Sequence, residues 1–202
     1  MTMDLTVEKV QAWLNDFSQE IEKNKHMLSE LDTPIGDGDH GNNMARGMAA
    51  YQEAFAAQQP KTITDTFKIL AMSLISKVGG ASGPLYGTAF MNFAKATKEV
   101  TAITNEEQLG ELIQEGLNGI QLRGKANVDD KTMVDVWAPV AEILKKNQPL
   151  TTEEITSAKE HTKELQAKKG RASYLGERSI GHIDPGAASS AILFQTLLPY
   201  LN

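Results

Sequence analysis

The chain has 202 residues, with 20 lysines and arginines against 26 aspartates and glutamates, a formal net charge of −6 and no cysteine. The lack of cysteine excludes disulfides, thiolate metal sites and cysteine nucleophiles, and an acidic chain without a basic stripe disfavours nucleic acid as a partner. At about 150 residues per domain, the length predicts one domain over residues 1–202. No window approaches the roughly 18 apolar residues of a membrane span, and the N-terminus lacks signal-peptide features. We therefore expect a cytoplasmic protein with no membrane partner.

Helical periodicity begins near the start of the chain. Val10, Leu14, Phe17 and Ile21 are three or four positions apart, which places them on one face of a helix. Similar patterns, bounded by glycine, proline and capping signals, predict eight helices and no strand. The predicted helices span residues 5–31, 42–57, 63–78, 87–98, 105–121, 130–146, 152–169 and 186–200.

Capping signals support several of these boundaries. Thr104 with Glu107, and Thr151 with Glu154, have the spacing of a capping box. The Asp184-Pro185 pair combines an N-cap acceptor with a ring that suits the first helical turn. Helices are therefore expected to begin near residues 105, 152 and 186.

The connections between the predicted helices are of two kinds. Three are short and polar: 58–62, 99–104 and 147–151. Four are dense in glycine, aspartate, serine or arginine: 32–41, 79–86, 122–129 and 170–185. The second kind follows the first, third, fifth and seventh helices. If neighbouring helices are antiparallel, these four segments converge at one end of the bundle.

The first of the four segments contains three carboxylates, Asp32, Asp37 and Asp39. Clustered carboxylates repel one another, and a bound cation relieves that repulsion. Oxygen ligands favour Mg²⁺ or Ca²⁺, but an EF-hand is excluded because its twelfth position, counted from Asp37, is Met48. A solvated acidic turn that caps the next helix is the alternative, and the adjacent His40 favours a metal site.

The second and fourth segments suit an anion. The glycine-rich turn at 79–88 leads into a helix, where N–H groups and the helix dipole favour negative charge. It is not a Walker A loop, and a simple C-cap is the alternative. In the fourth segment, Arg171 and Arg178 suit phosphate oxygens, with pairing to Glu177 or another acid as the alternative. Together with a cation site, these segments predict a metal–phosphate ligand.

Four motifs resemble the family of ADP-binding L subunits of bacterial dihydroxyacetone kinases. They are IGDGDHGNNM (35–44), GGASGPLYGTAF (79–90), DKTMVDVWAPV (130–140) and KGRASYLGERSIGHIDPGAASS (169–190). The resemblance implies an all-α fold, a closed barrel or bundle of eight antiparallel helices with the nucleotide site at one end. Asp130 departs from the glycine that the family pattern has before Lys131.

The resemblance also implies the residues of the site. Asp32, Asp37 and Asp39 would hold two Mg²⁺ ions that bridge the phosphates of ADP. The nucleotide would be bound by His40, Gly41, Asn42, Asn43, Ala81, Ser82, Gly124, Met133, Arg171, Arg178, Asp184, Pro185 and Gly186. No residue of this chain is expected to be phosphorylated, because phosphoryl transfer asks the protein mainly for positioning and charge neutralisation.

In the stand-alone form of this family, tightly bound ADP carries a phosphoryl group. A phosphohistidine subunit (M) of the phosphotransferase system converts ADP to ATP, and the group then passes to dihydroxyacetone on a kinase subunit (K). The resemblance implies a phosphoenolpyruvate-dependent glycerone kinase that is active only with these partners. Two alternatives stay open: an ATP-dependent kinase domain for another acceptor, as in fatty-acid kinases, and a nucleotide-dependent reporter to a transcription regulator.

Overall fold

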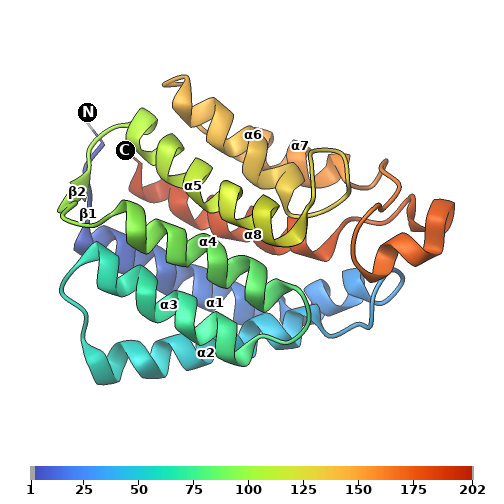
Figure 1. Ribbon diagram of the computed structural model, residues 1–202, viewed down its shortest axis with the longest axis horizontal. Helices are drawn as coiled ribbons and strands as arrows, with labels where there is room; N and C mark the ends of the chain where they lie inside the picture. Colours follow the sequence, from blue (N-terminus) through green and yellow to red (C-terminus); the bar gives the residue numbers. More distant parts are fainter. Residues whose placement is uncertain (1–2, 202) are drawn as a thin grey trace.

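The computed structural model describes residues 3–201, which are mostly helical (Figure 1). The α-helices of this part are α1 (Val7–Asp32), α2 (His40–Gln58), α3 (Ile63–Lys77), α4 (Ser82–Ala96), α5 (Glu106–Gly124), α6 (Val134–Lys145), α7 (Thr152–His161) and α8 (Pro185–Leu197). Two 3₁₀ helices, η1 (Arg171–Ser179) and η2 (Leu198–Tyr200), flank α8. The predicted all-α class is confirmed. Within residues 3–201, no helix has the length and apolarity needed to cross a membrane.

Three helix boundaries differ from the prediction by four residues or more, and the others lie within three. The fourth helix begins at Ser82, five residues before the predicted start at 87. The sixth begins at Val134 and not at 130, because Asp129 and Lys131 adopt φ angles of 67° and 61°, which an α-helix cannot contain. The seventh ends at His161 and not at 169, and turns follow it.

The capping predictions are mostly confirmed. The capping box of Thr151 and Glu154 is present at α7. At α8, the Asp184 carboxylate accepts a hydrogen bond from the Ala187 N–H at 2.8 Å. At α5 the predicted cap is wrong by one residue, because the side chain of Asn105, not that of Thr104, accepts from a first-turn N–H.

A short strand pair corrects the prediction that the chain has no strand. β1 (Leu5–Thr6) pairs antiparallel with β2 (Ala102–Ile103), with Leu5 opposite Ile103. Leu5 and Ile103 are both buried. The ladder therefore joins the segment before α1 to the link between α4 and α5.

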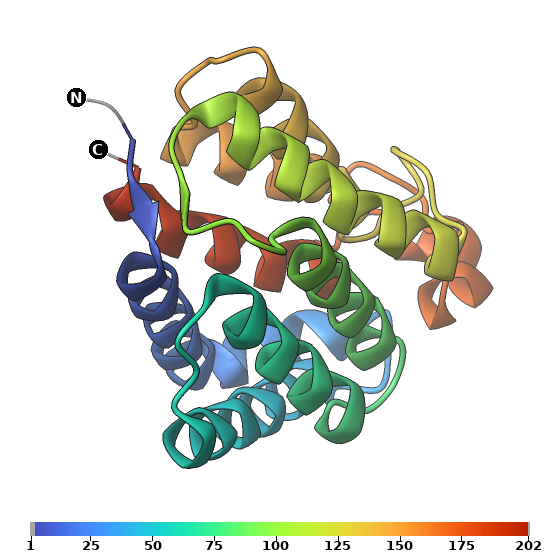
Figure 2. The same ribbon diagram turned by 60° about the vertical axis from the view of Figure 1, so that its left-hand side comes forward.

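The helices contact one another in a ring. Each packs against the next in sequence, and α8 packs against α1. Figure 2 shows α8, in red, beside α1, in dark blue. Because α7 is short, α6 also contacts α8 directly, and the strict closed barrel of eight members stays a prediction.

Aromatic side chains join the helices at the centre. Five of these side chains are fully buried: Trp13, Phe67, Phe90, Phe93 and Trp137. The rings of Phe67 and Phe93 meet edge to face with centroids 5.1 Å apart, and those of Phe93 and Trp137 are 5.9 Å apart. Such pairs stabilise a core beyond the area they bury. Phe67 and Phe93 each contact three of these rings, and Phe67 alone of the two contacts Trp13.

Phe67→Ala should lower the free energy of unfolding by about 3–5 kcal/mol, because it leaves a cavity among packed rings. Met72→Ala on the same helix is the control, since Met72 is 53% exposed and its loss should cost within about 0.5 kcal/mol. Urea denaturation followed by circular dichroism measures both. Equal losses in the two variants would contradict a stabilising role for the Phe67 ring in the core.

Candidate functional site

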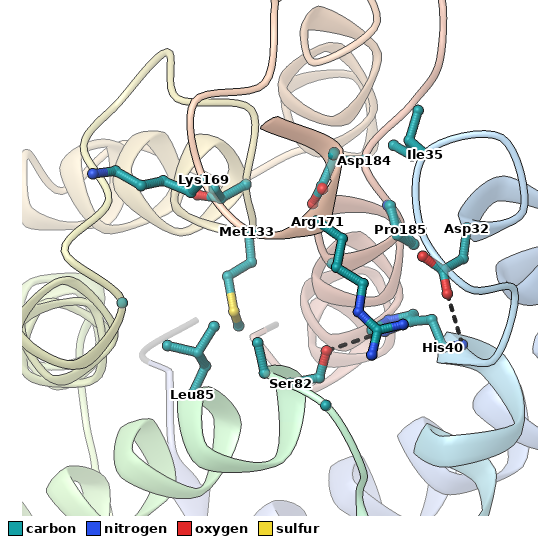
Figure 3. A pocket seen from close by; sticks show the side chains of 18 of the residues that line it. Asp32, Ile35, His40, Ser82, Leu85, Met133, Lys169, Arg171, Asp184 and Pro185 are labelled. Carbon is teal, nitrogen blue, oxygen red and sulfur yellow. Dashed lines mark hydrogen bonds between the residues drawn. The ribbon is translucent and has the colours of Figure 1, made fainter. Parts of the chain in front are cut away.

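A cavity of about 490 Å³ opens at the end of the bundle where α2, α4, α6 and α8 begin (Figure 3). Each of the four connections that lead into these helices contributes to its wall, for example through Asp37, Gly80, Thr132 and Arg171. The convergence predicted from the order of the helices is therefore confirmed.

Most of the predicted site residues lie on this wall. They are Asp32, Asp37, Asp39, His40, Asn43, Ala81, Ser82, Gly124, Met133, Arg171, Asp184, Pro185 and Gly186. Gly41, Asn42 and Arg178 do not line it. A Cβ on Gly41 would lie 1.8 Å from the Lys25 carbonyl oxygen, so this glycine lets α2 pack against α1. Asn42 and Arg178 have exposed side chains.

Three carboxylates meet at one side of the cavity. One ligand oxygen from each of Asp32, Asp37 and Asp39 lies within 4.8 Å of the others. Asp32 is buried at the end of α1, and its Oδ2 accepts hydrogen bonds from the N–H groups of Asp39 (3.0 Å) and His40 (3.2 Å). These contacts fold the α1–α2 loop around Asp32. An all-oxygen donor set of this kind fits a hard divalent cation.

The electrostatics of these carboxylates agree with that fit. Burial raises the pKa of Asp32, and the charges of Asp37 and Asp39 raise it further against the backbone hydrogen bonds. Burial also acts to raise the pKa of Asp37, but hydrogen bonding with Asp39 and the positive charge of Arg171 outweigh it and lower that pKa. Arg171 forms an ion pair with Asp37. Arg171 neutralises part of the charge of Asp37 only, and a bound cation would relieve the remaining repulsion among the three carboxylates.

The start of α4 is the place best suited to an anion. Among the described residues, no side chain caps its first N–H groups. The chain can turn into α4 here because Gly80 has a φ of 65° and because a Cβ on Gly83 would lie 2.3 Å from the Val78 carbonyl oxygen. The first turns of α2 and α8 are instead capped by Asp32 and Asp184. Uncapped N–H groups at the positive end of a helix bind phosphate.

His40 lies between three helix N-termini. Its Nδ1 is 3.1 Å from Ser82 Oγ on α4, and its Nε2 is 2.9 Å from Ser189 Oγ on α8 (Figure 3 draws the contact with Ser82). Burial lowers the pKa of His40 to about 4, so the ring is neutral at pH 7. Sequence reasoning missed Ser189, although its position one turn after Gly186 could have indicated it.

Lys131 is a second residue whose role sequence reasoning missed. Its buried ammonium donates hydrogen bonds to the carbonyl oxygens of Thr162 and His182. It therefore joins its own loop to the segments that follow α7 and precede α8. Burial lowers the pKa of Lys131 and raises the pKa of Asp184 to about 7.

The side of the cavity away from the carboxylates is apolar. Leu85, Ile120, Ala126 and Met133 line it, and Figure 3 shows Leu85 and Met133 across from Asp32 and His40. The cavity thus combines carboxylates that suit a cation, helix N–H groups that suit a phosphate and an apolar wall that suits a flat ring. This combination is what a metal-bound nucleotide requires.

Comparison with known sequences agrees with this geometry. The family model described as DAK2 domain matches residues 34–199. The ADP-binding subunit DhaL of PEP-dependent dihydroxyacetone kinase 1 from Listeria innocua is 54% identical over 186 residues, which is 92% of each chain. The ADP-binding subunit DhaL of the PTS-dependent dihydroxyacetone kinase of Lactococcus lactis is 50% identical over 198 residues, 98% of this chain and 97% of the relative.

Solved structures show the same fold. The native dihydroxyacetone kinase of C. freundii matches 94% of this chain with a TM-score of 0.75 and 22% identity. Its complex with AMP-PNP and Mg²⁺ matches with a TM-score of 0.71 and 23% identity. This chain spans 34% and 33% of those two longer chains.

Asp37→Asn should weaken binding of a divalent cation by about tenfold or more, because one charged ligand is lost. Mn²⁺ titration followed by electron paramagnetic resonance measures the affinity. Asp65→Asn, an exposed carboxylate in the first turn of α3 away from the cavity, is the control. Helicity should not change in either variant, since Asp37 lies in an exposed loop. Equal affinities in the two variants would contradict a cation site at Asp37.

Asp184→Asn should change how stability depends on pH, while the amide still caps α8. The raised pKa means that folded Asp184 keeps its proton up to about pH 7, whereas the unfolded chain releases it near its usual pKa of about 3.9. Between these values the folded state binds more protons, so this group makes stability fall as pH rises, by at most about 1.4 kcal/mol per pH unit.

Urea titrations of the metal-free protein from pH 4 to pH 8 test this expectation. Relative to Asp184→Asn, the wild-type protein should lose stability up to about pH 7 and show a constant difference above it. A difference that does not vary with pH would show that Asp184 is not protonated in the folded state.

Proposed function

This chain belongs to the DAK2 domain family, and we propose that it is the nucleotide-carrying subunit of a phosphoenolpyruvate-dependent dihydroxyacetone kinase. The observation that carries the proposal is one cavity in which three carboxylates, an uncapped helix N-terminus and an apolar wall face one another. Relatives named as ADP-binding subunits of such kinases match this chain over nearly its whole length, which supports the same role here.

In this role bound ADP takes a phosphoryl group from a phosphohistidine donor and yields it to dihydroxyacetone, while two Mg²⁺ ions neutralise its charge. Asp32, Asp37 and Asp39 would hold the cations. The N–H groups at the start of α4, from Ser82 onward, would bind phosphate oxygens. Arg171, now paired with Asp37, would add positive charge beside them.

The apolar wall would hold the base. Leu85 and Met133 lie on that side of the cavity (Figure 3), and Gly124 is beside them on the wall. A Cβ on Gly124 would come within 3.0 Å of the Leu85 side chain, so the glycine leaves room there. A flat, uncharged ring would displace water from these side chains, which favours its binding.

No side chain of this protein needs to carry the phosphoryl group. Both ring nitrogens of His40 already make hydrogen bonds, to Ser82 and Ser189. The residues of the cavity can supply positioning and charge neutralisation, which are the main demands of phosphoryl transfer. Between donor and acceptor, the phosphoryl group would therefore be carried by the nucleotide and not by a side chain of this protein.

The proposal includes two partners and the cytoplasm as the compartment. A separate kinase subunit (K) would bind dihydroxyacetone, and a phosphohistidine subunit (M) would supply the phosphoryl group. The isolated chain is then inactive toward dihydroxyacetone. Contact with a transcription regulator stays a prediction of the sequence resemblance.

The first test is to purify the protein without added nucleotide, dialyse it, denature it and measure what it releases. A resident carrier should release about one ADP and about two Mg²⁺ per chain, and Asp37→Asn protein should release much less of both. With the two partner subunits and phosphoenolpyruvate-derived phosphohistidine, dihydroxyacetone phosphate should form. Steady turnover of ATP and dihydroxyacetone by the isolated chain would contradict the proposal.

A further inference from the structure

Arg46, in the second turn of α2, connects the end of α3 to a side chain on the cavity wall. Its Nε donates a hydrogen bond to the Lys77 carbonyl oxygen at 2.9 Å, and its Nη2 donates to Asn43 Oδ1. Lys77 is the last residue of α3, where carbonyl groups lack a partner within the helix. The Lys77 carbonyl therefore anchors the guanidinium beside Asn43.

Two glycines allow these segments to approach closely. A Cβ on Gly47 would lie 2.3 Å from Val78 Cγ2, so the glycine lets α2 pack on the residue that follows α3. A Cβ on Gly79 would lie 3.3 Å from Asn43 Nδ2, which is a tight contact. The glycine-rich turn that leads into α4 therefore lies directly against the Asn43 amide.

The contact with Arg46 determines the orientation of the Asn43 amide. Arginine can only donate hydrogen bonds, so the atom that faces it is the amide oxygen, and the NH₂ group is left to donate elsewhere. None of the hydrogen bonds between described residues uses Asn43 Nδ2, yet no enclosed side-chain nitrogen or oxygen among these residues lacks a partner. Asn43 Nδ2 therefore reaches open space, and Asn43, which is only 6% exposed, lines the cavity.

Arg46 is placed to act through Asn43 and not on a ligand directly. It is not among the residues that line the cavity, and its Nε and Nη2 are already engaged. With the amide turned around, its oxygen would face the ligand, and an oxygen cannot donate to phosphate. Turning the amide would also cost the hydrogen bond from a charged donor, which is stronger than one from a neutral group.

We propose that Arg46 is a positioning residue that fixes the Asn43 amide with its NH₂ group toward the phosphates of the bound nucleotide. The inference rests on the proposed function, because the phosphates belong to that nucleotide. The Asn43 NH₂ group then adds a donor from α2 to the N–H groups at the start of α4. Arg46 itself touches neither phosphate nor cation.

The contacts of Arg46 can be measured first without a ligand, in full-length ¹⁵N-labelled protein dialysed against EDTA. Exposed arginine Nε–H groups exchange rapidly with water, whereas the hydrogen-bonded Nε–H of Arg46 should be protected and give a sharp ¹H–¹⁵N signal. Arg46→Lys assigns this signal. Arg46→Met should also shift the side-chain NH₂ signals of Asn43, which Asn43→Ala assigns. Exchange of the Arg46 Nε–H as fast as that of the other arginines would overturn the proposal.

Calorimetric titration with Mg²⁺–ADP tests the link to the ligand. Arg46→Met keeps an unbranched side chain but removes every donor, and it should weaken binding by about tenfold. Arg46→Lys keeps the charge without the planar fork and should recover only part of the affinity. Lys68→Met is the matched control, because Lys68 is an exposed cation on α3 outside the cavity, and its affinity should not change. Wild-type affinity in Arg46→Lys would overturn the proposal, since charge alone would then suffice.

A double-mutant cycle with Asn43 distinguishes positioning from a general loss of stability. Asn43→Ala alone should weaken Mg²⁺–ADP binding, and adding Arg46→Met should then cost at most about twofold more. A further loss of about tenfold in that background would overturn the proposal. Wild-type protein that failed to bind Mg²⁺–ADP would overturn the proposed function and, with it, the role of Asn43 toward phosphate. Normal wild-type binding without a loss in Arg46→Met would overturn the role of Arg46 alone.

Discussion

The site depends on the buried carboxylate of Asp32, which accepts hydrogen bonds from the backbone N–H groups of Asp39 and His40. These two bonds determine where the α1–α2 loop ends and α2 begins. They bring Asp37 and Asp39 back beside Asp32, and they place His40 between α4 and α8. One carboxylate thus serves as helix cap, as a cation-ligand candidate and as the group that holds the backbone of His40 in place. Its raised pKa reflects the cost of holding a charge there.

The residues that stabilise the fold and the residues of the candidate site lie in different parts of the helical bundle. The aromatic cluster around Phe67 holds the helices together in the interior, and the short links and the β1–β2 ladder lie at the other end from the cavity (Figure 1). Because consecutive helices are antiparallel, every irregular connection meets its counterparts at one end. The four loops of the site are therefore held in place by the helices that they connect. A binding site needs side chains held in fixed positions, and these helices provide that support.

Most of the correct predictions came from local patterns in the sequence, namely helical periodicity and capping motifs. Periodicity predicted the helices, and the capping patterns at Thr151 and Asp184 predicted where two of them begin. The start of α6 could not be predicted, since non-glycine residues such as Asp129 and Lys131 with positive φ are held by tertiary contacts. Ser189 was missed for a related reason. A serine in a helix gains its role from the histidine that packs on it, 149 positions away along the chain.

Lys131 has a consequence for how a ligand could enter. Its ammonium is enclosed by the backbone carbonyls of Thr162 and His182, so the segments it joins cannot separate without hydrating a buried charge. The loop before α6 and the two ends of the α7–α8 connection are therefore held together at this point. Between these two anchored points, the same connection meets the α1–α2 loop through the ion pair of Arg171 with Asp37, whose side chains are 67% and 41% exposed. Exposed pairs contribute at most about 1 kcal/mol, so separating η1 from the α1–α2 loop at this ion pair costs little.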